Sequence, residues 1–349
     1  MLCAVAVGDA LGHLAEGFWP TDVVLTYGGL IEDFPAEARE EGPTEAISAV
    51  RLPMPLGLEL VRRQPRRPRV TDDTAFTVLV ARSILARGRV DEDDIADRVL
   101  AEPIRGWPGW DEFRLAWKRG ERLRRTGTGG AMRVGPVGIF RRVRPGCLEE
   151  DLPALVEDAT SATRSTHNSV SSVAASAALA AAYAVIIEGE PQGGQENSRR
   201  DSALADAAVQ AAIQAAELAE REWERRGDPD DLCPFVSRRL RWVSSTVRRG
   251  TSIQGLRRLG LNPGFRAWEA VPAAFAIFLS CQDAREAILC AVNMGGDADS
   301  VASMAGALAA ALAPETLPPE WVDQVLRENG LEDLPYLALG LLELRTRPA

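Results

Sequence analysis

Long apolar runs, many of them rich in alanine, alternate with short polar segments along the chain. Apolar positions within the runs recur at helical spacing or fill every face. No sustained alternation of apolar and polar residues lies between hairpin turns, so a sheet is not indicated. The pattern therefore predicts an all-α fold. The expected helices span Thr74–Ala86, Glu92–Leu100, Phe113–Leu123, Val170–Ile187, Ala203–Arg225, Leu232–Arg248, Ala270–Phe278, Asp283–Val292, Ser300–Leu312 and Pro319–Glu328.

Three segments between the predicted helices stand out. Trp19 to Arg69 is rich in Pro, Gly and Arg and ends in the basic run Arg62–Arg69. So long an irregular stretch is typical of a functional loop or a disordered one. The segment Thr126–Gly138 holds five glycines, and Pro191–Arg200 reads as a polar surface loop. We find no internal repeat, and the candidate chemistry lies on both sides of that last loop, so we expect a single domain over residues 1–349.

Composition limits the classes of partner and compartment. A formal charge of −10 argues against a surface for long nucleic acid. Five scattered cysteines without a CxxC pair indicate a reducing cytoplasm, and two histidines make a zinc site of His and Cys improbable. The apolar run Val173–Ile187, of about 15 residues, is shorter than the ~20 that cross a bilayer, which predicts a buried helix and no membrane span.

Two of the predicted helices, one apolar on nearly every face and one without a single charge, each begin with a pair of acidic residues. Thr71-Asp72-Asp73-Thr74 precedes one of them, and Asp297-Ala298-Asp299-Ser300 precedes the other. Such residues can simply cap a helix and complement its dipole. A helix that is apolar all round is buried, however, so its first turn carries these carboxylates into the interior. Buried like charges do not all stay ionised without a counter-charge.

A hard divalent cation is the counter-charge that suits this pattern. Mg²⁺ prefers carboxylate, hydroxyl and water oxygens. Adjacent aspartates on one side and an Asp-x-Asp turn on the other fit a two-metal centre, whose ions lie about 3.5–4 Å apart and share ligands. The spacing thus favours two Mg²⁺ ions, with Mn²⁺ as a possible substitute.

At these residues the chain resembles the ADP-ribosylglycohydrolase family, which includes the hydrolase that reactivates dinitrogenase reductase. Five segments match in the family's order and span the chain from Gly8 to Leu312. They are Val7-Gly8-Asp9-Ala10-Leu11-Gly12, Thr71-Asp72-Asp73-Thr74, Gly127-Thr128-Gly129-Gly130-Ala131-Met132-Arg133-Val134, Thr166-His167-Asn168, and Val292-Asn293-Met294-Gly295-Gly296-Asp297-Ala298-Asp299-Ser300.

The resemblance implies a single compact bundle of orthogonal helices with a binuclear Mg²⁺ site at the floor of a cleft. It implies that the glycine-rich turn holds a diphosphate and that His167 contacts ADP-ribose. Glu16 falls where the family carries a catalytic glutamate on a mobile loop, and either Glu16 or Asp299 would be the general base. The implied metal ligands are Thr71, Asp72, Asp73, Asp297, Asp299 and Ser300, and the implied substrate contacts are Gly127, Thr128, Gly129, Gly130, Met132 and His167.

Other positions are open to more than one interpretation. Asp9 fits a supporting role, bracing the Thr71–Asp73 turn by hydrogen bonds. Arg133 can contact phosphate or pair with an acid. The family often has Asn where Thr128 stands, Thr where Ala298 stands and Thr where Ser300 stands, but Ser300 keeps the hydroxyl.

The expected activity is hydrolysis of a glycosidic bond in ADP-ribosylated protein or a small ADP-ribose conjugate, by a cytoplasmic monomer. One alternative is a module that binds ADP-ribose without cleaving it. Another is a magnesium-dependent lyase of prenyl diphosphates, but Asp72-Asp73 is followed by Thr74, Ala75 and Phe76, so the third acid of that motif is missing. The linkage, to arginine, serine, a nucleic-acid end or a metabolite, is not encoded in any motif.

Overall fold

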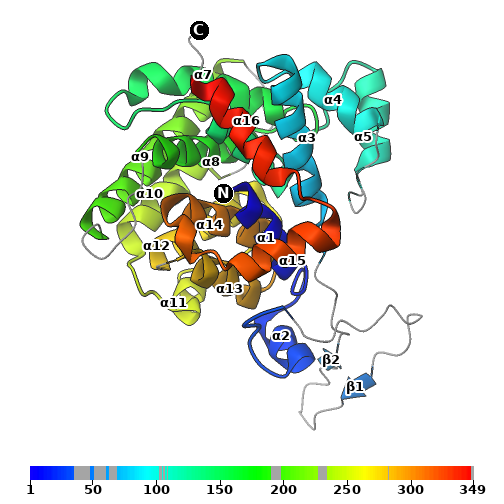
Figure 1. Cartoon of the computed structure of the whole chain (residues 1–349), viewed down its shortest axis with the longest axis vertical. Coiled ribbons are helices and arrows are strands. Elements are labelled where there is room, and N and C mark those ends of the chain that lie inside the picture. The colour runs from blue at the N-terminus through cyan, green and yellow to red at the C-terminus, as the bar shows by residue number, and fades with distance from the viewer. Residues whose placement is uncertain are drawn as a thin grey trace.

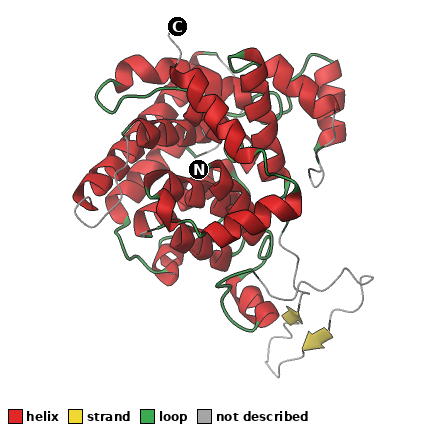
Figure 2. Cartoon of the chain, in the orientation of Figure 1, coloured by secondary structure: helices red, strands yellow, loops and turns green. Residues whose placement is uncertain are grey.

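The computed structural model describes residues 1–34, 48–50, 60–62, 69–101, 104, 107, 109–189, 198–226, 234–281 and 283–346. Helices make up most of this part of the chain, which confirms the all-α prediction (Figure 2). The helices are α1 (Leu2–Gly12), α2 (Pro20–Tyr27), α3 (Asp72–Arg87), α4 (Glu92–Ala101), α5 (Trp110–Lys118), α6 (Gly135–Phe140), α7 (Leu148–Thr163), α8 (Val170–Glu188), α9 (Ser198–Arg225), α10 (Val236–Thr246), α11 (Ile253–Arg258), α12 (Ala267–Ser280), α13 (Ala284–Met294), α14 (Ala298–Leu312), α15 (Pro319–Asn329) and α16 (Leu334–Thr346), with 3₁₀ turns η1 (Thr128–Gly130) and η3 (Pro314–Thr316).

The core is built around three helices with little charge. α1 and α14 pack along each other at the centre of the molecule, and α8 contacts α14, α9 and α6 (Figure 1). Alanine dominates these contacts, so the helix backbones approach closely. The first and last parts of the sequence therefore meet in the interior, which brings the distant acidic helix starts into one neighbourhood.

Helix α8 is longer than the apolar run Val173–Ile187 that marks it in the sequence. Its 19 residues are long and apolar enough to cross a membrane by length and composition, but 94% of the window that meets this test is buried inside the protein. A core helix meets the same test, and this burial is what the sequence pattern predicted for the segment.

Local signals explain where the key helices begin and end. The Thr71 hydroxyl accepts a hydrogen bond from the Asp73 backbone N–H at 3.3 Å and caps α3, which ends at Gly88 in the left-handed conformation. The Ser169 hydroxyl likewise accepts from the Ser172 N–H at 3.2 Å and caps α8. Caps of this kind satisfy backbone donors that have no partner within the helix.

Several predicted boundaries were wrong. The stretch Trp19–Arg69 contains α2 and a pair of short antiparallel strands, β1 (Ser48–Val50) and β2 (Leu60–Arg62), so the prediction of no sheet fails there. Three residues a strand is too short to show an alternating pattern. Residues 63–68 of the basic run lie outside the described part of the chain.

Other differences concern helix ends and helices without a clear signal. The glycine-rich segment contains α6, whose start is favoured by Pro136 in the first turn. α9 begins at Ser198, within the predicted surface loop, and α5 ends at Lys118, ahead of the expected Leu123. α7 and α16 were not predicted because each carries a proline in its first half, and α10 begins only at Val236.

Candidate active site

The two acidic helix starts lie side by side. The Ser300 hydroxyl at the start of α14 donates to Asp73 Oδ2 at 3.2 Å, and the Ser303 hydroxyl donates to Asp73 Oδ1 at 3.4 Å. The Asp73, Asp297 and Asp299 side chains are buried, whereas Asp72 is half-buried. We call Asp72, Asp73, Asp297 and Asp299 the acid cluster.

Asp9 on α1 holds the α3 side of the acid cluster in place. Its carboxylate is fully buried and accepts from the backbone N–H groups of Thr71 (2.9 Å) and Thr74 (3.0 Å) and from the Thr74 hydroxyl (2.5 Å). These bonds occupy the carboxylate with the backbone of the turn, which is the geometry expected of a bracing residue.

Glycines allow the α14 side to approach. A side-chain Cβ at Gly12 would lie 2.4 Å from the Asp299 Cα, so α1 and α14 touch through this glycine. Gly295 and Gly296 have positive φ angles of 68° and 70°, which favour glycine. Cβ atoms there would lie 2.2 Å from the Phe18 carbonyl oxygen and 1.9 Å from that of Pro263. The turn that presents Asp297 therefore tolerates only glycine at these two positions.

The carboxyl groups of the acid cluster are largely buried close to one another, and this raises their pKa values. Burial raises the pKa of Asp72 to about 6, helped by the charge of Asp9, and burial raises the pKa of Asp297 to about 7. Burial, reinforced by the neighbouring carboxylates, also raises the pKa of Asp73 and of Asp299 well above the ordinary value of 3.8. Like charges in a dry site disfavour full ionisation.

The nearest buried cation does not neutralise these acids by contact. Arg133 is fully buried, and its guanidinium donates to the Ala162 carbonyl (2.9 Å) and the Thr163 carbonyl (3.1 Å) and lies over the Phe76 ring. Of the two interpretations of Arg133, the direct acid pair is not formed among the described residues. It ties α7 to the glycine-rich turn.

Two oxygen atoms of the cluster have no hydrogen-bond partner although they are buried, Asp297 Oδ2 and Asp299 Oδ1. Asp297 begins α14 without capping it through its side chain, so helix capping does not explain this residue. Within the described residues, no three His, Cys, Asp or Glu side chains are grouped closely enough to hold a metal ion by themselves. Hydroxyls and water would have to complete any ion's coordination, as Mg²⁺ commonly requires.

The glycine-rich turn lies next to the cluster. The Thr128 hydroxyl is 3.5 Å from the Ser300 hydroxyl, and a hydrogen bond between Thr128 and Asp297 partly offsets the effect of burial on the Asp297 pKa. A Cβ at Gly129 would lie 2.3 Å from His167 Cε1, so this glycine lets the turn close against the imidazole. Met132 is buried on the cluster side, with its sulfur 3.9 Å from the Ser300 hydroxyl oxygen.

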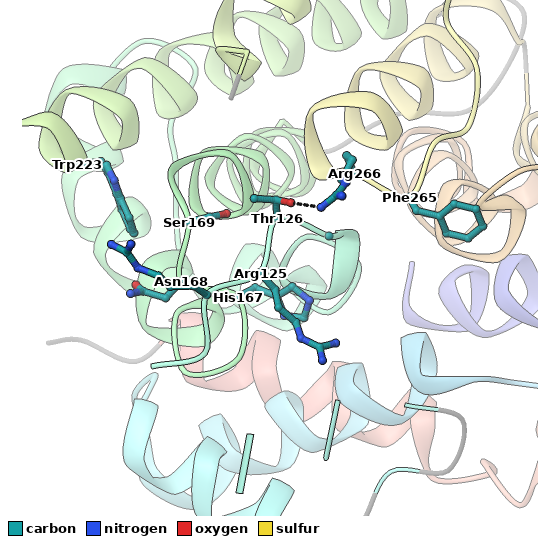
Figure 3. A pocket seen from close by; sticks show the side chains of 10 residues that line it. Arg125, Thr126, His167, Asn168, Ser169, Trp223, Phe265 and Arg266 are labelled. Carbon is teal, nitrogen blue, oxygen red and sulfur yellow. Dashed lines mark hydrogen bonds between the residues drawn. The ribbon is translucent and has the colours of Figure 1, made fainter. Parts of the chain in front are cut away.

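His167 and Gly127 both line a cavity of about 620 Å³, which we call the large cavity (Figure 3). Burial, with help from the charges of Arg133 and Arg125, lowers the pKa of His167 well below 6.5, so the imidazole is neutral at pH 7. Its Nδ1 lies 2.9 Å from the Thr166 hydroxyl oxygen. The ring is thus fixed in orientation and able to accept or donate one hydrogen bond.

Sequence reasoning missed most of the large cavity's lining. The Arg124, Arg125 and Arg266 side chains make it basic, and Trp223 adds an aromatic wall. The Arg266 guanidinium donates to the Thr126 hydroxyl at 2.5 Å. Arg124 and Arg125 directly precede the glycine-rich turn, which was the one available signal, whereas Trp223 and Arg266 come from parts of the chain without a motif.

Glu16 lies on the turn that follows α1, at the rim of the acid cluster. Its side chain is 37% exposed, and its carboxylate is 3.5 Å from the His13 imidazole nitrogen. Its charge contributes to the raised pKa values of Asp72, Asp297 and Asp299. The structure therefore brings every predicted acidic residue of the site into one region.

A family model described as ADP-ribosylglycohydrolase matches residues 1–348, and the chain belongs to this family. It is 26% identical to an uncharacterized protein of Archaeoglobus fulgidus, over 99% of this chain and 96% of the relative. It is also 27% identical to ADP-ribosylhydrolase ARH3 of Gallus gallus, over 72% of each. A solved ADP-ribosylglycohydrolase-related protein complex has the same fold, with a TM-score of 0.58 and 24% identity over 99% of this chain and 96% of that one.

Proposed function

We propose that the protein is a Mg²⁺-dependent hydrolase that cleaves the glycosidic bond of ADP-ribosylated protein or a small ADP-ribose conjugate. Family membership and the similarity to the avian ADP-ribosylhydrolase support the substrate class. The observation that supports the metal is the acid cluster, which holds two buried carboxylate oxygens without partners. Buried anions of this density need a cation to remain ionised near neutral pH.

The ligands proposed for two ions are Thr71, Asp72 and Asp73 at the start of α3, and Asp297, Asp299 and Ser300 at the start of α14. When bound, the ions would orient the ribose hydroxyls and acidify a water molecule. The chemistry of the donor set fits, since every candidate atom is an oxygen. Asp9 would keep the α3 turn in position without touching the ions, because its oxygens already accept from Thr71 and Thr74.

The chain's other residues provide positioning and proton transfer. The basic large cavity next to the glycine-rich turn suits a diphosphate, and neutral His167 supplies a fixed hydrogen-bonding group there. In hydrolysis the bond from the anomeric carbon to the leaving group breaks, and the oxygen of water forms the new bond to that carbon. A carboxylate takes the water's proton, and the leaving group gains one. Glu16 and Asp299 are both candidates for that carboxylate.

A panel of ADP-ribosyl substrates tests the proposal. Release of ADP-ribose from arginine-linked and serine-linked peptides is measured under three conditions: with Mg²⁺, with Mn²⁺, and after chelation with EDTA. The Mg²⁺ concentration is about 5 mM, an excess that saturates even a weak site. We expect turnover of at least one linkage that EDTA abolishes and Mg²⁺ restores. Tight binding of ADP-ribose without turnover of any substrate would contradict the proposal and establish a binding module.

A further inference from the structure

The structure holds a second cavity beside the acid cluster, of about 370 Å³, lined in part by Phe18, Trp19, Arg257, Asn262 and Phe265. We call it the small cavity. The proposed function assigns it no role. Resting on that proposed function, we infer that the small cavity receives the leaving group of the substrate and selects one that contains a planar aromatic ring without a positive charge.

The small cavity adjoins the acid cluster through the backbone. Gly296 lines it and directly precedes Asp297, while Gly17 lines it and directly follows Glu16. The Gly17 N–H donates to the Gly296 carbonyl at 2.7 Å, and the Gly296 N–H donates to the Phe18 carbonyl at 2.8 Å. The floor of the small cavity is thus the same backbone that presents the candidate base and a candidate metal ligand.

The two cavities meet at Phe265, which lines both. Figure 3 shows the Phe265 ring pointing away from the other labelled side chains of the large cavity. Asp297 directly follows Gly296, which lines the small cavity, and its neighbour Ser300 lies 3.5 Å from Thr128, which directly follows Gly127 in the lining of the large cavity. A substrate with its nucleotide in the large cavity and its anomeric carbon at the acid cluster would direct its leaving group into the small cavity.

The lining indicates the chemistry of that leaving group. Trp19 is 70% exposed and Phe265 is 54% exposed, an unusual state for two large rings that border one cavity. Arg257 is the only charged residue among the described residues that line it. Exposed rings stack on planar groups, and the guanidinium repels a cation such as arginine.

Turnover of matched substrates tests the inference. ADP-ribose carrying a phenolic, a serine or an arginine leaving group is assayed with wild type, Trp19→Ala and Arg257→Gln. Intrinsic reactivity cancels in the ratio of variant to wild type. We expect Trp19→Ala to lower kcat/KM for the phenolic substrate about tenfold more than for the serine substrate. Arg257→Gln should raise the relative rate for the arginine substrate about fivefold. Trp242→Ala and Arg258→Gln, at a tryptophan and an arginine outside the cavity, are the matched controls.

A binding measurement separates the inference from the proposed function. Fluorine NMR line widths of 4-fluorobenzoate and of 4-fluorobenzamidine, an aromatic anion and a cation of similar size, need no catalysis. We expect wild type to broaden the fluorine line of the benzoate but not that of the benzamidine. Trp19→Ala should abolish the broadening of the benzoate line, and Arg257→Gln should broaden the benzamidine line. Equal changes with the control variants, or unaltered substrate ratios in Trp19→Ala, would overturn the inference while leaving hydrolysis intact. Failure of every substrate to react, with the NMR result as expected, would instead refute only the proposed hydrolysis.

Discussion

Two regions of the molecule share one sequence pattern and differ in their electrostatics. α4 begins with Glu92, Asp93 and Asp94, much as α3 begins with its aspartate pair, and Glu92 and Asp94 are buried. Asp94 accepts from Ser83 (2.6 Å), Arg87 (2.8 Å) and Arg98 (2.6 Å). Burial raises its pKa, but these bonds outweigh burial, and the net pKa is lowered.

The acid cluster shows the opposite outcome. Burial raises the pKa of each of its aspartates, and no arginine contacts them among the described residues. Acidic first turns therefore do not identify a metal site by themselves. The two regions differ in that the acid cluster lacks a counter-charge, so a cation from solution would find unpaired carboxylates at α3 and α14 but not at α4.

The largest effect should come from removing the α14 acids. We expect Asp297→Ala/Asp299→Ala to lose activity by at least about 10³-fold, because both proposed ions lose ligands on one side. Asp93→Ala/Asp97→Ala removes two exposed carboxylates from α4 and serves as the matched control. ADP-ribose release by the two double variants is compared at equal helix content by circular dichroism. Full activity of the first variant in EDTA would refute the site.

Removing the paired acid of α4 should instead reduce stability. Asp94→Ala leaves the buried Ser83 hydroxyl without its acceptor and the more exposed guanidinium groups of Arg87 and Arg98 without a carboxylate, so we expect the free energy of unfolding to fall by about 1–2 kcal/mol. Urea denaturation measures this change, and Mg²⁺-dependent stabilisation should stay as in wild type. An unchanged midpoint would show that the α4 network contributes nothing to stability.

An isosteric change within the acid cluster should raise the stability of the protein rather than lower it. Asp299→Asn removes one of several repelling buried charges, so the metal-free protein should gain about 1 kcal/mol of stability. The variant should also lose most of the stabilisation that Mg²⁺ gives wild type. Thermal unfolding with EDTA and with Mg²⁺ provides both numbers. Destabilisation of the metal-free form would mean that the carboxylate has a structural partner.

The smallest effect concerns pH. The folded-state pKa values of Asp72, about 6, and Asp297, about 7, lie above the unfolded value of 3.8. Without metal these groups favour folding at low pH, and that contribution declines as pH rises toward 7. A cation needs the ionised form, so Mg²⁺ affinity should weaken several-fold between pH 8 and pH 6. Calorimetric titration at both pH values measures it, and a pH-independent affinity would contradict the assignment.

Much of the fold and the acidic residues of the site followed from the sequence because their signals are local. Apolar runs marked α8 and α14, and the aspartate pairs marked the starts of α3 and α14. The cavity linings did not follow, since Trp223, Arg257 and Arg266 have meaning only through tertiary contacts. The role of Arg133 was also hidden, because its partners are backbone carbonyls of Ala162 and Thr163. Ligand class and linkage depend on such contacts.

The hydrogen bond between Ser300 and Asp73 joins residues 227 positions apart in the chain. A ribosome makes α3 long before it makes α14, so a nascent chain carries only one half of the acid cluster for most of its synthesis. Under the proposed function, catalytic competence therefore arises only once α14 has docked against α1. Fragments that end before α14 would carry only the α3 half of the acid cluster.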